Sequence, residues 1–482
     1  MKYVVLFPVW LIALTGWAQK SKQDPQKAKL EVIKSLDSES SKYSEIAHKI
    51  WEYAEVGFQE KNSSALLQET LAQAGFRIES GVAGMPTAFV ATYGSGKPVV
   101  GILGEFDALP GVSQDAVPEL KSVEGRPAGH ACGHHLFGTA SAAAAIAVKN
   151  WMISNNKSGT LRFYGTPAEE GGSGKVYMVR EGLFNDVDVV FHWHPGAQNN
   201  ASAGSSLANK TGKFRFYGVA SHAAAAPDRG RSALDGVEAM NDMVNMMREH
   251  VPQEARMHYV ITRGGEAPNV VPAFAEVYYY VRHPQRTVVK DLWDRITRAA
   301  QGAALGTDTK VEWEITGGVY DLLPNETLAR VVDANLRLVG GYGYTEEEKS
   351  FAEKIQKTFT TTPPALSTTG TVNEFKVNLG SGFGSTDVGD VSWVVPTAGL
   401  STATWVPGTA AHSWQAVAAG GMSIGHKGMM MAAKTLALSM MDVYSNPVLI
   451  DNTWKEFRTR TGENFKYESL IGDRPPALNY RN

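Results

Sequence analysis

The feature that most constrains the fold is an alternation of short apolar strands with helices between residues 99 and 191. Strands that alternate with helices form a mainly parallel sheet covered on both faces. In such sheets, ligands bind beyond the carboxyl ends of the strands. The pattern therefore predicts an α/β domain whose functional residues follow its strands. The strands are expected at Val99–Leu103, Leu161–Tyr164 and Val187–Phe191, and the helices at Ser141–Trp151 and Gly174–Glu181.

A second pattern interrupts the first between residues 209 and 321. Here the expected order is strand, helix, strand, strand, helix, strand, which is the order of a ferredoxin-like unit. We therefore predict an inserted ferredoxin-like domain at 209–321, flanked by a sheet domain made of 19–208 and 322–482. The strands are expected at Lys213–Val219, His258–Arg263, Glu276–Arg282 and Val311–Ile315, and the helices at Arg231–His250 and Thr287–Ala300.

The N-terminus has the pattern of a secretory signal peptide. Lys2 precedes the apolar run Val4–Trp17, and Gly16-Trp17-Ala18 places small residues around the expected cleavage after Ala18. The run is shorter than the ~20 residues of a membrane span; a membrane anchor is the alternative interpretation. We expect residues 1–18 to be removed and the chain to be periplasmic or secreted, with no stable membrane span. The Lys- and Gln-rich residues 19–30 are expected to form a flexible lead.

Charge and cysteine content exclude other classes. The 482 residues include 46 Lys and Arg against 49 Asp and Glu, so no basic field exists to hold a phosphate backbone, and nucleic acid is not an expected partner. The chain has a single cysteine, Cys132, which excludes a disulfide within the chain. A lone cysteine is ordinarily a small buried hydrophobe, but the neighbours of Cys132 suggest another role.

Four short segments concentrate groups that bind metals or move protons. Most of them follow expected strands or open an expected helix, and the first lies where a helix end and a cation would lower a thiol pKa. The second holds Glu169 and Glu170, whose side chains point in different directions, so that one can bind a metal while the other faces the substrate. Imidazole, carboxylate and thiolate together suit zinc, or manganese where oxygen dominates. The segments are Gly129–His135, Pro167–Gly172, His192–Pro195 and Gly408–Ser413.

These segments resemble the amidohydrolase branch of the aminoacylase/carboxypeptidase family of two-metal exopeptidases, peptidase family M20. The resemblance implies a zinc-peptidase-like α/β domain with an inserted ferredoxin-like lid. It also implies a metal-dependent amidohydrolase that cleaves an N-acyl amino acid, an aminobenzoyl-glutamate-like compound or a dipeptide. It rests on Glu105–Pro110, Gly129–His135, Pro167–Gly172, His194, Gly218–Pro227, Gly264–Arg282 and Ala411–Ser413.

The resemblance implies two divalent metal ions per subunit, zinc or manganese. Cys132 would bridge them. His134 and His194 would complete one site, and Glu170 and His412 the other. Bound in this way, two metals can acidify a water and hold the charge that develops on a carbonyl oxygen.

The remaining roles implied by the resemblance concern the substrate. Glu169 would be the general base, and Asp107 would orient a metal ligand. His222 on the lid would reach the active site of a neighbouring subunit and polarise the scissile carbonyl. Asn269 and Arg282 would bind the substrate, since an arginine fork suits a carboxylate. The partner would be a second copy joined through the lid, or a related subunit.

The chain departs from the family in two ways. His135 stands where the family usually has Asp or Asn, so it is a candidate extra ligand. The export signal also differs from the cytoplasmic aminobenzoyl-glutamate hydrolases, which leaves the substrate open. A non-catalytic partner subunit is the alternative function. A zinc nucleobase deaminase needs a second cysteine, and a serine hydrolase needs a Gly-x-Ser-x-Gly elbow, and the sequence supplies neither.

Overall fold

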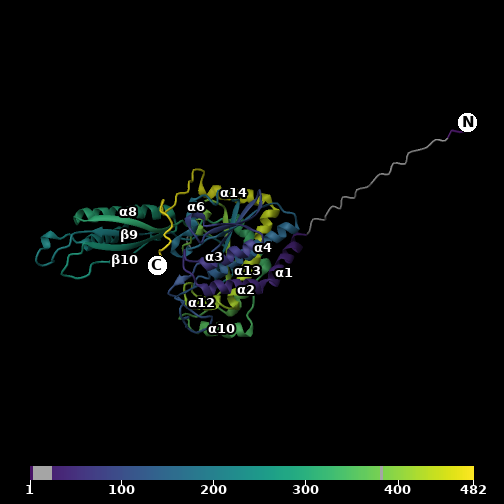
Figure 1. Cartoon of the computed structure of the whole chain (residues 1–482), viewed down its shortest axis with the longest axis horizontal. Coiled ribbons are helices and arrows are strands. Elements are labelled where there is room, and N and C mark those ends of the chain that lie inside the picture. The colour runs from purple at the N-terminus through teal and green to yellow at the C-terminus, as the bar shows by residue number, and fades with distance from the viewer. Residues whose placement is uncertain (4–23, 380–383, 482) are drawn as a thin grey trace.

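The computed structural model of the chain describes residues 1–3, 24–379 and 384–481. It has two lobes (Figure 1). The larger lobe contains most of the helices, and a narrower lobe formed around α8, β9 and β10 extends from its side. Apart from its first three residues, the predicted signal peptide lies outside the described residues.

A six-stranded sheet forms the centre of the larger lobe. Its order is β1-β2-β6-β3-β7-β14. The four strands from β6 to β14 are parallel, and β1 and β2 extend the sheet in antiparallel fashion. The predicted mainly parallel α/β fold is confirmed. The strands are β1 (Arg77–Ser80), β2 (Phe89–Ser95), β3 (Val99–Gly104), β6 (Gly159–Gly165), β7 (Val189–Gly196) and β14 (Thr397–Ala403).

Two long apolar helices pack on this sheet and on each other. They are α4 (His134–Ser154) and α13 (Ser423–Ser445), which contact β7 together. By length and composition α4 could cross a membrane, but most of it is buried inside the lobe, as in the core helix of a soluble protein. Its burial fixes the position of its first residue, His134, at the end of the sheet.

Further helices and short strands complete the larger lobe. One of them, α1 (Pro25–Ser38), shows that the expected flexible lead is wrong from Pro25 onwards. Asp24 caps this helix, and Ala28, Val32 and Leu36 bury one side of it in the core. The others are α2 (Ser40–Tyr53), α3 (Lys61–Gln73), α5 (Glu169–Gly172), α6 (Gly174–Arg180), α9 (Glu326–Val339), α10 (Glu346–Gln356), α11 (Val388–Ser392), α12 (Trp414–Gly420), α14 (Pro447–Thr461), β4 (Leu109–Pro110), β5 (Ala128–Gly129), β8 (Ala203–Gly204) and β13 (Val377–Asn378).

The smaller lobe is an antiparallel sheet of order β10-β11-β9-β12 with two helices. Its elements follow one another in the ferredoxin-like order that the sequence predicts. Helices α7 and α8 cover one face, where Val277, Tyr279 and Val281 are buried, and Tyr280 and Arg282 alternate onto the other face. The elements are β9 (Ala208–Tyr217), α7 (Ala233–Met247), β10 (Arg256–Arg263), β11 (Phe274–His283), α8 (Arg286–Gly306) and β12 (Lys310–Val319).

Both ends of this insertion lie at the junction of the lobes. The backbone N–H of Leu322 donates to Ser206 Oγ at 2.9 Å, so the chain enters and leaves at the same place. The ten residues of β9 then carry the chain ~30 Å away from the junction, at about 3.4 Å per residue. Loops that follow Tyr217 are therefore far from the larger lobe of their own subunit.

Candidate active site

Chemically active side chains gather where the four parallel strands end. Since the carboxyl ends of parallel strands meet at one edge of a sheet, residues distant in sequence become neighbours there. One further group comes from the loop that opens α4. Glu105 and Asp107 follow β3, Glu169 and Glu170 follow β6, His194 lies in the last turn of β7, His412 follows β14, and Cys132 and His134 lie at the start of α4.

Gly133 allows the loop before α4 to approach the end of β7. Its φ is +78°, and a Cβ built on it would lie 2.7 Å from the Cβ of Pro195. A side chain would thus be disfavoured both by the backbone and by the neighbour. The loop also binds the segment after β14, because the N–H of His412 donates to the carbonyl of Ala131 at 3.0 Å. Three strand ends are joined in this way.

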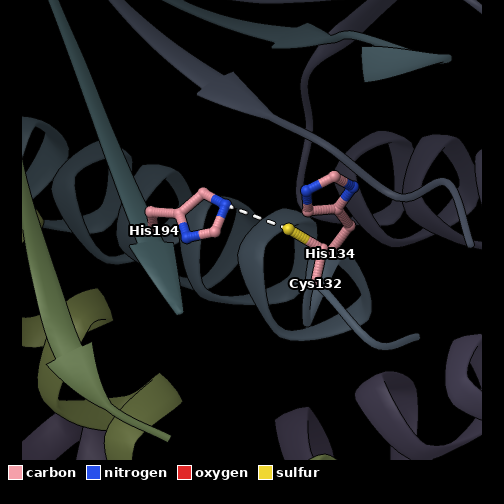
Figure 2. A group of neighbouring side chains, drawn as sticks. All are labelled: Cys132, His134 and His194. Carbon is pink, nitrogen blue, oxygen red and sulfur yellow. Dashed lines mark hydrogen bonds between the residues drawn. The ribbon is translucent and has the colours of Figure 1, made fainter. Parts of the chain in front are cut away.

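Three overlapping groups of potential metal ligands result among the described residues. Figure 2 shows the first, in which Cys132 and His134 from the α4 loop face His194 from β7. In each group the ligand atoms lie within 4.8 Å of one another, and Cys132 belongs to two groups, so its sulfur can be shared by two ions. The groups are Cys132, His134 and His194; Cys132, Glu170 and His412; and His134, Glu169 and Glu170.

The hydrogen bonds of the histidines leave their second nitrogens available. His134 Nδ1 donates to Asp107 Oδ1 at 2.9 Å, and His194 Nδ1 donates to the carbonyl of Pro195 at 2.7 Å. Since carboxylate and carbonyl oxygens only accept, each Nε2 carries a lone pair. His194 Nε2 lies 3.4 Å from Cys132 Sγ, and His134 Nε2 is buried without a hydrogen-bond partner among the described residues. A sulfur, two imidazole nitrogens and carboxylates arranged in this way fit a divalent metal.

Asp107 connects two of these groups. One of its oxygens accepts from His134, and the other accepts from the backbone N–H of Glu170 at 2.9 Å. Burial acts to raise the pKa of Asp107, but His134 and the hydrogen bonds outweigh it and lower that pKa. The ionised carboxylate can therefore orient a histidine and a carboxylate at once, in keeping with the role implied by the resemblance.

The adjacent carboxylates of Glu169 and Glu170 have opposite electrostatics. Burial and the charge of Glu170 raise the pKa of Glu169 well above its ordinary value. Burial acts in the same direction on Glu170, but His412, whose Nε2 lies 3.0 Å from Glu170 Oε1, lowers the pKa of that residue. Neighbouring carboxylates whose pKa values are pushed apart suit an acid–base role for one and a permanent charge for the other.

The thiol of Cys132 differs from the sequence expectation. A helix end and a cation were expected to lower its pKa, whereas burial raises the pKa of Cys132 well above the ordinary value in spite of nearby His134. The protein's own groups therefore do not make the thiolate. Metal binding, which displaces a thiol proton, would do so.

A buried lysine behind the ligands is a functional residue that the sequence did not reveal. Lys175 is fully buried, and its Nζ lies 2.6 Å from Glu105 Oε1 and 2.7 Å from Asp387 Oδ1. The other oxygen of Glu105 lies 3.1 Å from His134 Nε2. The lysine thus neutralises a carboxylate that faces the ligand cluster. In the sequence, Lys175 resembles any lysine in the first turn of a helix, and only its partners distinguish it.

Replacing Lys175 by Met should destabilise the protein by about 3–5 kcal/mol, because two buried carboxylates lose their counter-charge. Urea unfolding of the purified variant measures the change. Lys349→Met is the matched control, since Lys349 pairs with Glu346 at the surface of α10, and it should unfold as the wild type does. A Lys175→Met variant as stable as this control would show that the buried pair is dispensable.

His135 does not belong to the ligand cluster, so its interpretation as an extra ligand is wrong. Its Nε2 faces the carbonyl of Gly420 at 3.0 Å, and its ring packs on that of His130 with centroids 4.8 Å apart. Burial lowers the pKa of His135 well below the ordinary value. The residue is a neutral histidine of the core beside α12.

The three lid residues fall into two places. His222 and Asn269 lie together in exposed loops beyond the far end of β9, where the N–H of Ala223 donates to the carbonyl of Asn269. The structure does not bring them to the ligand cluster of their own subunit. Arg282 lies near the junction instead, opposite Asn209 at the start of β9.

Arg282 faces the carboxylates of the larger lobe. Its guanidinium lies over the ring of Tyr280, 4.3 Å from the centroid, and its Nε is buried without a hydrogen-bond partner among the described residues. Burial raises the pKa of Tyr280, which Arg282 lowers and Glu169 raises, so both charges lie within reach of this ring. Tyr280 is thus a second site residue that sequence reasoning missed, because alternation along a strand does not show what the strand faces.

Comparisons with known proteins agree with this geometry. Residues 101–382 match the family described as Peptidase family M20/M25/M40. One of the two p-aminobenzoyl-glutamate hydrolase subunits of Escherichia coli is 41% identical over 452 residues, covering 89% of this chain and 94% of that protein. The Xaa-Arg dipeptidase of Mus musculus is 29% identical over 461 residues, covering 90% and 94%.

Solved structures agree in fold. The YXEP protein of Bacillus subtilis, described as a dinuclear metal binding peptidase from the M20 family, matches with a TM-score of 0.56. The match covers 85% of this chain and 99% of that one, at 16% sequence identity. At this identity the likeness concerns the fold, including the inserted lobe.

Proposed function

The chain belongs to peptidase family M20/M25/M40 and is a hydrolase that acts on amides, and from this premise we propose that it cleaves a linear amide whose amino-acid part carries a free carboxylate. N-acyl amino acids, aminobenzoyl-glutamate-like compounds and dipeptides are the substrate classes. The single observation that carries the proposal is the cluster of metal-ligating groups beside Glu169, with Arg282 facing it from the lid.

Two divalent ions, zinc or manganese, are the proposed cofactors. Cys132 is shared between them; His134 and His194 hold one ion, and Glu170 and His412 hold the other. The two ligand groups that share Cys132 support this assignment, as does the unpartnered Nε2 of His134. When bound, such ions supply Lewis acidity that lowers the pKa of a water and offsets charge on the substrate carbonyl oxygen.

The protein's own residues move the proton and position the substrate. Glu169, whose carboxyl holds a proton more readily than Glu170, takes a proton from the attacking water and delivers it to the leaving amine. Arg282 binds the substrate carboxylate with its guanidinium, which Tyr280 supports from below. Asp107 keeps His134 and Glu170 oriented during these steps.

The proposed assembly is a pair of subunits joined through the lids, either two copies of this chain or this chain with a related subunit. Strand β10 is an edge of the lid sheet, and its Val260 and Ile261 are exposed. His222 is exposed at the far end of the same lobe, in a position to polarise a carbonyl in a neighbour's site. The relative from Escherichia coli is named as one subunit of its hydrolase, which supports a multi-subunit assembly.

We further propose that the chain is exported to the periplasm or secreted, with residues 1–18 removed. The N-terminal sequence pattern supports this proposal. N-terminal sequencing of the exported protein should then begin at Gln19. A non-catalytic subunit is not favoured, because the chain retains Glu169 together with every proposed metal ligand.

Metal removal and substrate screening test the proposed function together. The metal-loaded protein should hydrolyse at least one N-acyl amino acid, aminobenzoyl-glutamate or dipeptide, and chelation should abolish the activity until zinc or manganese is restored. Arg282→Met should raise KM for such a substrate but not for its carboxamide analogue, since only the former offers a carboxylate to the guanidinium. Fully loaded protein that hydrolyses none of the three classes would contradict the proposal.

A further inference from the structure

The segment that follows α14 runs from the outer surface of the larger lobe to the junction of the two lobes (Figure 1), where the chain reaches residue 481. It contains no helix or strand, yet Leu470 and Ile471 are buried. None of the metal-ligand segments lies in it. Its last described residues nonetheless contact the turn that carries Glu169 and Glu170.

Side chains and backbone from both lobes hold this segment in place. Arg180 of α6 donates to the carbonyls of Gly472 at 3.1 Å and Arg474 at 2.7 Å. Arg474 in turn donates to the carbonyl of Ile315, on strand β12 of the lid, at 2.5 Å. Gln59 donates to the carbonyl of Leu478 at 2.8 Å. The residues that follow Leu478 therefore reach the turn from a fixed starting point.

Two donors from the segment share one acceptor in the turn. Tyr480 Oη donates to the carbonyl of Glu170 at 2.8 Å, and Arg481 Nη2 donates to the same oxygen at 2.5 Å. The N–H of Glu170 is held from the opposite side by Asp107. Both backbone polar groups of Glu170 are thus engaged, one by the α/β core and one by the segment.

The turn needs such support because its backbone is strained. Ala168 and Ser173 are in the left-handed region, with φ of +57° and +58°, and Gly171 lies between them at +87°. Residues other than glycine adopt this region at a cost, and they persist there when the surroundings hold them. Without outside hydrogen bonds, the adjacent carboxylates would be free to turn away from the ligand cluster.

The contact with Tyr480 is built into a distant part of the chain. A Cβ on Gly57 would lie 2.1 Å from Tyr480 Oη, although Gly57 does not have a positive φ that would require glycine. The glycine thus makes room for the phenol. The ring of Phe58 packs edge-on against Tyr480, with centroids 5.6 Å apart. The loop at 57–58 therefore forms a seat for the tyrosine.

We propose that Tyr480 and Arg481 are positioning residues of the active site, which hold the carbonyl of Glu170 and thereby aim the carboxylates of Glu169 and Glu170. They touch neither the ligand atoms nor the substrate in the arrangement described above. Their effect on turnover rests on the proposed function, whereas their effect on metal binding does not.

The test compares Tyr480→Phe, Arg481→Ala and the double variant with Asn479→Ala, an exposed neighbour in the same segment. Tyr480→Phe keeps the ring and removes only the donor. Zinc affinity of the apo-protein, measured by competition with a chelating dye, should weaken roughly tenfold or more in the double variant, as for other residues that support metal ligands. At saturating zinc its kcat should fall by about 10²-fold with little change in KM, because misplacement by ~1 Å is that costly.

The single variants should show smaller losses, and Arg481→Lys, which keeps a donor, should recover part of the loss seen in Arg481→Ala. A double variant that binds zinc as tightly and turns over as fast as Asn479→Ala would overturn the proposal. So would a loss explained by a lower melting temperature alone, with zinc affinity and kcat unchanged in the folded protein. If the wild type hydrolyses no amide, the proposed function fails, and the zinc titration still decides the role of Tyr480 and Arg481.

Discussion

Replacing Glu169 by Gln should lower turnover by about 10²-fold or more while the protein keeps its full metal content. The amide preserves the size of the side chain but cannot take a proton from the attacking water. Burial and Glu170 together raise the pKa of Glu169, as suits a group that accepts and then delivers a proton. Steady-state kinetics and elemental analysis of the same preparation measure both quantities.

Glu170→Gln is the matched comparison for this prediction. Glu170 lies with Cys132 and His412 in one ligand group, and its lowered pKa keeps it charged. The variant should lose occupancy of one metal, and excess metal should restore part of its activity, which it cannot do for Glu169→Gln. Equal metal loss in the two variants would contradict the proposed division of roles.

Replacing His222 by Ala should also lower turnover by about 10²-fold, the effect of removing one donor to a developing oxyanion. Metal binding should be unchanged, because His222 lies beyond the far end of β9 and outside the ligand cluster of its own subunit. Kinetics with fully metal-loaded protein measure the effect. A variant with normal turnover would show that His222 serves no active site.

Mixing two inactive variants tests whether His222 acts in a neighbouring subunit. In a hybrid of His222→Ala with Glu169→Gln, one active site contains an intact Glu169 and receives an intact His222. If equal amounts exchange at random in a symmetric dimer, about a quarter of the wild-type activity should return. The mixture of His222→Ala with wild-type-like Asn479→Ala controls for exchange. Subunits that exchange without regaining activity would rule out this assembly.

The fold and the ligand set could be predicted because both depend on local patterns. Strand and helix periodicity indicated the sheet, and residues that follow parallel strands must meet at one edge. Cys132, Glu170 and His412 are therefore found together although they come from three separate segments. The pattern Ala28, Val32, Leu36 was equally legible as one side of a helix, and the polar composition around it concealed it.

The supporting residues could not be predicted, since their roles depend on contacts and not on spacing. Lys175 has no local mark that separates it from a surface lysine, and Asp387, its partner, lies more than 200 residues later. Tyr480 lies further still from the turn that it contacts. Hydrogen bonds of this range appear only once the topology is known. They also explain why the motifs identified the ligands but not the residues that aim them.

The position of the lid insertion imposes an order in time on the candidate metal centre. Cys132, His134 and His194 all precede the lid, whereas His412 follows His194 by more than 200 residues. At ~5–20 residues per second, a ribosome makes the first ligand group at least 10 s before it makes the last ligand of the second. A nascent chain can therefore acquire one ion while the second site does not yet exist. Amide hydrolysis by a half-made molecule is excluded by the order of its own synthesis.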